Sequence, residues 1–172
     1  MPPTTKILLK QLAPLIPNPS QGLPEEVFLF LSGITPLINV DLLIQDERKQ
    51  TLLTWRDDNY SAPGWHIPGG IIRFKETAAE RIHATAQQEL HAMVEFDPTP
   101  LALHEIIHPV RDERGHSISL LYRCRLLSTL DASRHCQASH PRRDAWQWHT
   151  QFPENMIPAQ GIYRPFFSHN PE

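Results

Sequence analysis

Apolar and polar positions follow two different periodicities along this chain. From Thr77 to Leu90, apolar residues recur every three or four positions, which is the spacing of one helix face. The run LINVDLLIQ, residues 37–45, is apolar and β-branched enough for a buried strand. After the polar turn DERK, the run QTLLTW is predicted to complete a hairpin with that strand.

Weaker patterns predict the remaining elements. Pro24, followed by two glutamates, favours a short helix that ends near Ser32–Gly33. Apolar runs predict strands at 101–107 and 117–126, a short strand at 146–148, and a short C-terminal helix that starts at Pro153. This strand-rich plan with few helices indicates the α+β class.

The N-terminal segment differs from the rest of the chain because prolines crowd it. They predict an irregular arm over residues 1–22, followed by a single domain over residues 23–172. Lys10 and Pro14 interrupt the apolar residues of the arm, so neither a signal peptide nor a membrane span is expected. We therefore expect a cytoplasmic protein.

Composition excludes several classes of function. The net charge is -3 with mixed signs, which provides no basic field for nucleic acid and no polybasic patch for a membrane. Cys124 and Cys136 are not in a Cys-x-x-Cys arrangement, so we expect ordinary reduced thiols. The candidate chemistry therefore lies elsewhere in the sequence.

The segment from Gly64 to Ala92, GWHIPGGIIRFKETAAERIHATAQQELHA, resembles a Nudix box. That pattern is a glycine, five residues, a glutamate, seven residues, then Arg-Glu-aliphatic-x-Glu-Glu-x-Gly. The positions that follow it are Gly70, Glu76, Ala86 and Glu89. The positions that depart from it are Ala84, Thr85, Gln88 and His91. The resemblance implies a Nudix α/β/α sandwich with a mixed central sheet.

Within the superfamily, the departures are most similar to those of the GDP-mannose mannosyl hydrolases, which keep the last glutamate and use one magnesium ion. The flanking sequence from Ile34 to Gly70 resembles the same family. Carried over by position, the Gly69 carbonyl and the Glu89 carboxylate are expected to bind Mg²⁺, and Gln88 offers a neutral oxygen. Asp41 and Arg56 stand at the nucleotide-binding positions of the family.

A general base near neutrality is also needed, and histidine is the natural candidate. We favour His140, because it lies in the loop where the resembled family carries its base, with His116 and His135 as alternatives. In this reaction, water attacks the anomeric carbon of the sugar while the metal stabilises the leaving group.

These observations favour Mg²⁺-dependent hydrolysis of a GDP-mannose-like nucleoside diphosphate sugar, which releases nucleoside diphosphate and sugar. Two alternatives stay open. One is ordinary Nudix pyrophosphohydrolysis of an ADP-ribose-like substrate. The other is a catalytically silent Nudix-fold module that binds a nucleotide or a protein, because fold alone does not guarantee activity. The resemblance also implies a homodimer.

Structural roles compete with functional ones at several of these positions. Asp41 interrupts an apolar strand, so it either pairs with Arg56 across the hairpin or binds the ligand. Glu76 is expected to stabilise the helix start rather than to bind metal. His66 is expected to be structural.

Overall fold

A computed structural model describes residues 4–58, 61–136 and 141–167 of the chain. The α-helices are α1 (Thr5–Leu12), α2 (Glu25–Ser32) and α3 (Ala78–Thr85). The 3₁₀-helical segments are η1 (Ala13–Leu15), η2 (Pro19–Gln21), η4 (Ala132–Arg134) and η5 (Pro158–Phe166), and η3 (Ala86–Leu90) is π-helical. The strands are β1 (Leu37–Ile44), β2 (Thr51–Arg56), β3 (Gly64–His66), β4 (Gly69–Ile71), β5 (Val94–Phe96), β6 (Ala102–Ile107), β7 (His116–Leu126) and β8 (Trp146–His149).

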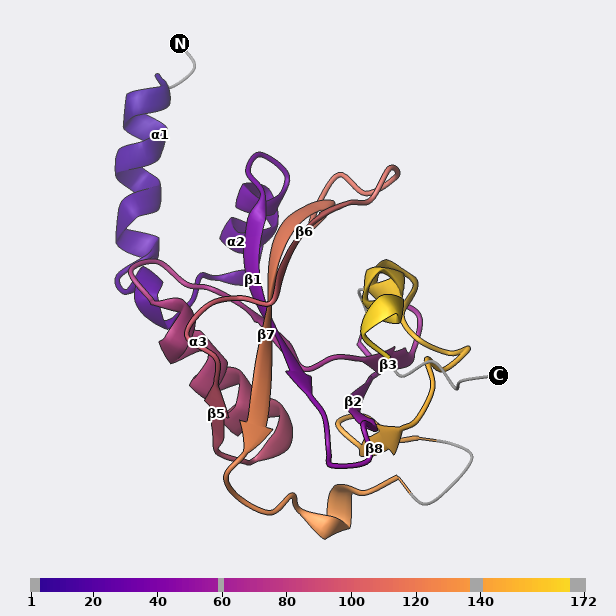
Figure 1. Ribbon diagram of the computed structural model, residues 1–172. Coiled ribbons are helices and arrows are strands. Elements are labelled where there is room, and N and C mark those ends of the chain that lie inside the picture. The colour runs from indigo at the N-terminus through magenta and orange to yellow at the C-terminus, as the bar shows by residue number, and fades with distance from the viewer. Residues whose placement is uncertain (1–3, 59–60, 137–140, 168–172) are drawn as a thin grey trace.

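The strands form a mixed sheet and a smaller antiparallel one (Figure 1). In the first, β4, β1, β7 and β5 follow one another, and β6 also pairs with the long strand β7. β1 and β7 run parallel, whereas the other pairs in this sheet are antiparallel. The second sheet has the order β3-β2-β8. The α+β class and the mixed sheet predicted above are therefore confirmed.

The predicted hairpin between residues 37–45 and QTLLTW is wrong. β1 and β2 meet only at a single bridge between Gln45 and Thr51, beside the turn, and then enter different sheets. β7 pairs with one edge of β1 along residues 37–44, and β4 pairs with the other edge at residues 39–41. An apolar run shows that a strand is buried, but it does not show which strand lies beside it.

Helix α3 covers one face of the mixed sheet. Thr77 and Glu80 form a reciprocal capping box at its first turn, which satisfies backbone donors that a helix start leaves unpaired. Its buried Ile82 packs in one core cluster with Val40 and Leu42 of β1. On the opposite face, Leu43 joins a second cluster with residues of the smaller sheet and of η5.

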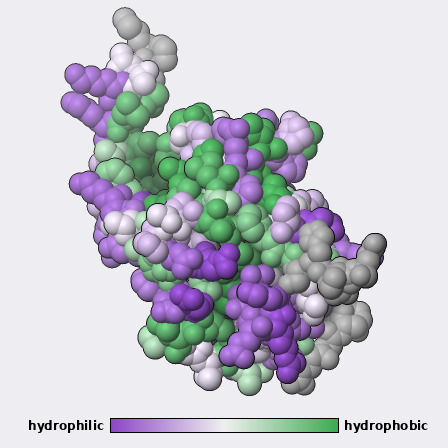
Figure 2. Space-filling model, viewed as in Figure 1, coloured by the Kyte–Doolittle hydropathy of each residue, from purple (hydrophilic) through white to green (hydrophobic). Residues whose placement is uncertain are grey.

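The N-terminal segment is not irregular throughout. Residues Thr5–Leu12 form α1, because no proline occurs between Pro3 and Pro14. This helix projects from the body of the molecule (Figure 1), and none of its residues is buried. Figure 2 shows apolar surface at the base of α1 and over the upper part of the same face. In the part of the chain described above, no helix has the length and apolarity that crossing a membrane requires.

The C-terminal helical segment begins at Pro158 rather than at Pro153. The residues between the two prolines lie beside β3 instead. The Trp65 amide donates to the Asn155 carbonyl at 2.9 Å, and the Ile157 amide donates to the Trp65 carbonyl at 2.9 Å. After a turn at residues 154–155, this pairing holds Met156 and Ile157 beside β3.

Candidate functional site

A cleft of about 800 Å³ lies over the part of the mixed sheet that η5 leaves uncovered. Alternate residues of β1, namely Leu37, Asn39 and Asp41, form its floor, because alternate side chains of a strand share one face. Its walls come from α2, from the loop after β4, and from the first residues of η5. Pro19 and Gly22 of the N-terminal segment also line it, so the boundary placed at residue 22 remains a prediction.

The glycine pair at the inner end of the cleft is needed for close packing. A Cβ on Gly69 would overlap the Asp41 carboxylate, and a Cβ on Gly70 would overlap the Thr85 hydroxyl. Thr85 occupies a carboxylate position of the box, but its buried hydroxyl faces Gly70. The two glycines therefore let β1, β4 and α3 approach one another around the backbone of residue 69.

Glu89 reaches this backbone from the end of the same helix. The helix widens into the π-helical turn η3, a feature that often marks functional sites, and Glu89 lies on that turn. The Gly69 amide donates to Glu89 Oε1 at 3.2 Å, and the Thr54 hydroxyl donates to Glu89 Oε2 at 2.9 Å. Burial raises the pKa of Glu89 to about 7, although these two hydrogen bonds act in the opposite direction.

His66 lies behind Thr54 and lines the cleft. Its Nε2 is 3.0 Å from the Thr54 hydroxyl and 3.6 Å from Glu89 Oε2, and its Nδ1 donates to the Ile67 carbonyl at 2.9 Å. Burial, reinforced by the positive charge of Arg56, lowers the pKa of His66 to about 4. The residue expected to be only structural thus joins the Glu89 network.

Asp41 approaches Gly69 from β1 but is held differently. Its Oδ2 accepts hydrogen bonds from the Ser119 hydroxyl and from the Tyr163 hydroxyl, the latter at 2.6 Å. Burial raises the pKa of Asp41, whereas these hydrogen bonds lower it by a smaller amount. The ion-pair partner of Arg56 is Asp58, at 2.7 Å, rather than Asp41, so of the two alternatives for Asp41 only ligand binding remains a prediction.

Glu76 is bound by an arginine one helical turn before the box arginine position. Arg81 binds both carboxylate oxygens of Glu76, at 2.8 and 2.7 Å, and the Arg73 amide donates to the same carboxylate. Glu76 therefore ties the loop before α3 to the helix, while Glu80 forms the cap at the helix start.

The structure brings most of the predicted site residues to one end of the cleft. Gly69, Gln88, Asp41 and Arg56 line it, and Glu89 contacts Gly69. His140 lies outside the described residues, so its role as a base remains a prediction. Neither of its alternatives lines this cleft: His116 contacts Glu105, and His135 packs on Trp146.

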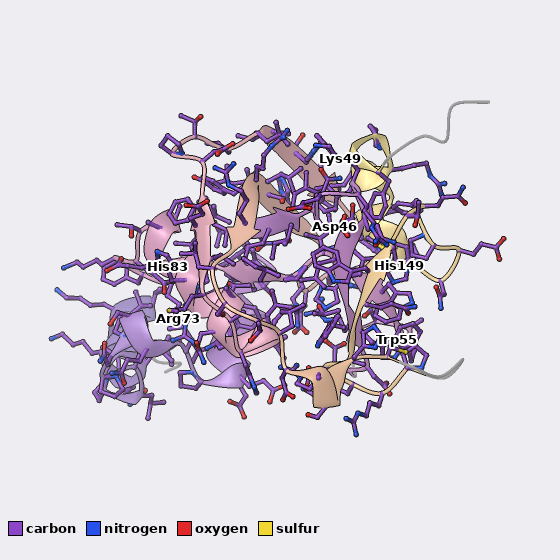
Figure 3. The ribbon with its side chains drawn as sticks, turned by 60° about the horizontal axis from the view of Figure 1, so that its bottom comes forward. Asp46, Lys49, Trp55, Arg73, His83 and His149 are labelled. Atoms are coloured by element: carbon purple, nitrogen blue, oxygen red, sulfur yellow. The ribbon has the colours of Figure 1, made fainter. Side chains whose placement is uncertain are left out.

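Two sides of the molecule contribute cations to the cleft. Arg73 comes from the loop before α3, and Arg56 ends β2. Figure 3 shows Arg73 and His83 on one side of the molecule, with Trp55 and His149 of the smaller sheet on the other. Arg56 and Arg73 therefore line the same cleft as Gly69.

A magnesium site was predicted at Glu89, the Gly69 carbonyl and the Gln88 amide oxygen. Across the residues that the structure describes, no three His, Cys, Asp or Glu side chains are grouped so that they could hold a metal. Mg²⁺ accepts one or two carboxylates together with substrate phosphates and waters. The role of these three groups as magnesium ligands therefore remains a prediction.

The fold was compared with solved structures. A MutT Nudix hydrolase from Burkholderia pseudomallei superposes with a TM-score of 0.59 and 19% identity, over 78% of this chain and 99% of the other. The MutT protein from Methanosarcina mazei Go1 superposes with a TM-score of 0.57 and 19% identity, over 78% of this chain and 92% of the other. This chain has the Nudix fold. A UDP-X diphosphatase superposes with a TM-score of 0.54 and 17% identity, over 91% of this chain and 73% of the other.

Sequence comparison gives a more limited result. The chain matches no protein-family model. It is 27% identical over 98 residues to the low-salt glycan biosynthesis protein Agl8 of Haloferax volcanii. That match covers 57% of this chain and 62% of the length of Agl8.

Five residues of the site were not predicted as functional: Thr54, Arg73, Arg81, Ser119 and Tyr163. A signal for Thr54 and Ser119 existed, since each is a hydroxyl residue inside an otherwise apolar strand. Arg81 and Tyr163 gave no such signal, because their partners lie on other elements and depend on the fold.

Proposed function

We propose that this Nudix-fold protein is a Mg²⁺-dependent hydrolase of a nucleoside diphosphate sugar. The observation that carries the proposal is the Glu89 carboxylate, which accepts a hydrogen bond from the amide of Gly69, a residue that lines the cleft together with Arg56 and Arg73. Glu89, Gly69 and Gln88 would bind one magnesium ion, and that ion would neutralise charge on the diphosphate. Arg56, with Arg73, would bind the phosphate oxygens.

A single metal favours attack at carbon over attack at phosphorus. Canonical Nudix enzymes that attack phosphorus use several metals held by carboxylates, whereas this chain keeps only Glu76 and Glu89 of the box carboxylates, and Glu76 is bound by Arg81. In the proposed reaction, a water oxygen forms a bond to the anomeric carbon and the bond from that carbon to the phosphate oxygen breaks. Nucleoside diphosphate and free sugar, such as GDP and mannose, are the products. The similarity to a glycan biosynthesis protein supports a sugar-containing substrate.

A second candidate is hydrolysis of the diphosphate itself, as in an ADP-ribose-like substrate. The UDP-X diphosphatase, whose similarity extends over 91% of this chain, favours it. The products would then be a nucleoside monophosphate and a sugar phosphate.

One experiment separates the two reactions. The protein is incubated with Mg²⁺ and a panel of nucleotide sugars and dinucleotides in ¹⁸O-water, and products are identified by phosphorus NMR and mass spectrometry. We expect nucleoside diphosphate with ¹⁸O in the released sugar. Label in a phosphate would establish the second candidate instead. Nucleotide binding without turnover of any compound would contradict both and identify a silent binding module.

A further inference from the structure

Strand β2 places one hydroxyl group between Glu89 and His66. Thr54 is 2% exposed and lies in a strand whose neighbouring residues are apolar. Its hydroxyl donates to Glu89 Oε2 at 2.9 Å and is 3.0 Å from Nε2 of His66. A buried hydroxyl is costly unless it is hydrogen-bonded, so valine would suit this position better if packing were its only role.

The backbone fixes the relative position of Thr54 and His66. The two residues are directly opposite each other in the antiparallel pairing of β2 with β3, where side chains on one face stand about 5 Å apart. The His66 ring is 7% exposed, and its Nδ1 is anchored on the Ile67 carbonyl. The ring therefore has little freedom to leave the hydroxyl.

We propose that Thr54 and His66 are positioning residues that orient Glu89 for a divalent cation in the cleft. This inference rests on the metal site of the proposed function. The Gly69 amide holds one carboxylate oxygen, and the Thr54 hydroxyl lies between the other carboxylate oxygen and Nε2 of His66, with one proton to donate to these two acceptors. A site with a single carboxylate ligand depends strongly on the orientation of that ligand, and outer partners of metal ligands contribute about 10- to 100-fold in affinity or activity.

The test uses Mn²⁺ alone as the probe, with free Mn²⁺ measured by electron paramagnetic resonance during titration of the full-length chain. Thr54→Val keeps the shape and removes the hydroxyl, and it is expected to weaken Mn²⁺ binding by about 10- to 100-fold. Thr54→Ser restores the hydroxyl and is expected to recover most of the lost affinity. Thr51→Val is the matched control, because Thr51 is a fully buried threonine of the same strand that bonds to Gln45.

His66→Phe provides a second reading, since it keeps a ring in the pocket and removes Nε2. It is expected to weaken Mn²⁺ binding by about 10-fold and to lower kcat more than it raises KM. Circular dichroism identifies any variant that fails to fold, and if Thr54→Val fails, His66→Phe decides alone. Wild-type affinity and kcat in the folded variants would overturn the positioning role. Absence of Mn²⁺ binding by the wild-type chain would instead contradict the metal site of the proposed function.

Discussion

Asp41 and Glu89 approach the same glycine from different elements but are held in different ways. Asp41 is 5% exposed, and two hydroxyl groups from β7 and η5 donate to the same oxygen of its carboxylate. The Glu89 side chain is 23% exposed and accepts bonds from Thr54 and the Gly69 amide. Burial raises the pKa of both carboxylates, so burial alone does not distinguish their roles.

The difference lies in what each carboxylate connects. Hydrogen bonds to Asp41 connect β1 with Ser119 of β7 and with Tyr163 of η5. The first residues of η5 form one wall of the cleft. Glu89 joins the end of the α3 helix to the glycine loop and remains partly open. We infer that Asp41 chiefly maintains the shape of the cleft, whereas Glu89 provides a ligand. The predictions below test this division.

The largest effect is expected from Glu89→Gln. It removes the negative charge that a cation requires while preserving shape, so kcat should fall by about 10³-fold, the scale of losing a principal electrostatic contribution. Stability should change by less than about 1 kcal/mol, because the amide oxygen still accepts a hydrogen bond. Glu154→Gln, at an exposed position outside the cleft lining, is the control for the same chemical change. Metal-dependent turnover at the wild-type rate in Glu89→Gln would contradict the assignment of Glu89 as a metal ligand.

A third carboxylate, that of Glu76, sharpens the comparison because its pKa shifts the other way. Burial acts to raise its pKa, but the hydrogen bonds from Arg81 and the Arg73 amide outweigh it and lower the pKa below the ordinary 4.5. The ion pair of Glu76 with Arg81 therefore stabilises the fold above pH 4.5, and this contribution is lost as the pH falls through the lowered pKa of Glu76.

Arg81→Met removes the cation from this pair and should cost about 3 kcal/mol near pH 7, the scale for breaking a buried ion pair. The difference from the wild-type chain should shrink as the pH falls below 4.5 and through the lowered pKa of Glu76, because Glu76 then becomes neutral in both proteins. Urea denaturation at a series of pH values measures it. A difference that stays constant with pH would show that Arg81 acts through packing alone.

The sequence predicted the elements whose signals are local. The apolar spacing of 77–90 placed the best helix, and the runs at 37–45 and 117–126 placed the central strands. Pairing was less predictable: Leu52 and Leu53 are both fully buried, one in each core cluster, so their apolar character gave no indication of which sheet β2 would join.

The same limit applies to the site. Position within a motif was enough to select Glu89, Gly69 and Gln88. Asp41 was selected as well, but its partners were not, because Ser119 and Tyr163 are 78 and 122 residues away along the chain. A hydrogen bond across such separations depends on the packing of η5 against the sheet, which no local pattern contains.

Tyr163→Phe tests the structural half of the comparison. It removes one hydroxyl donor from Asp41, so unfolding should become easier by about 1 to 2 kcal/mol, the scale of a hydrogen bond to a charged group. The Mn²⁺ affinity of Glu89 should change little. Tyr122→Phe, in the core cluster on the opposite face of the sheet, is the matched substitution for thermal unfolding. A loss of Mn²⁺ affinity as large as that of Thr54→Val would show that Asp41 takes part in metal binding.

The smallest effect concerns the end of the helix that carries Glu89. His91 has φ of 52°, in the left-handed region, at the position where the Nudix pattern has glycine. A residue with a side chain costs about 1 to 2 kcal/mol in this backbone conformation, and glycine would relieve that strain. The greater conformational freedom of glycine in the unfolded chain offsets part of the stability gained in this way. His91→Gly should therefore stabilise the fold by about 0.5 kcal/mol or more. His83→Gly, inside α3, should destabilise it by about 1 kcal/mol, because glycine weakens a right-handed helix. Shifts of opposite sign in the urea midpoint would show that backbone conformation, and not loss of the imidazole, determines the effect on stability. Destabilisation by both substitutions would refute the strain at His91.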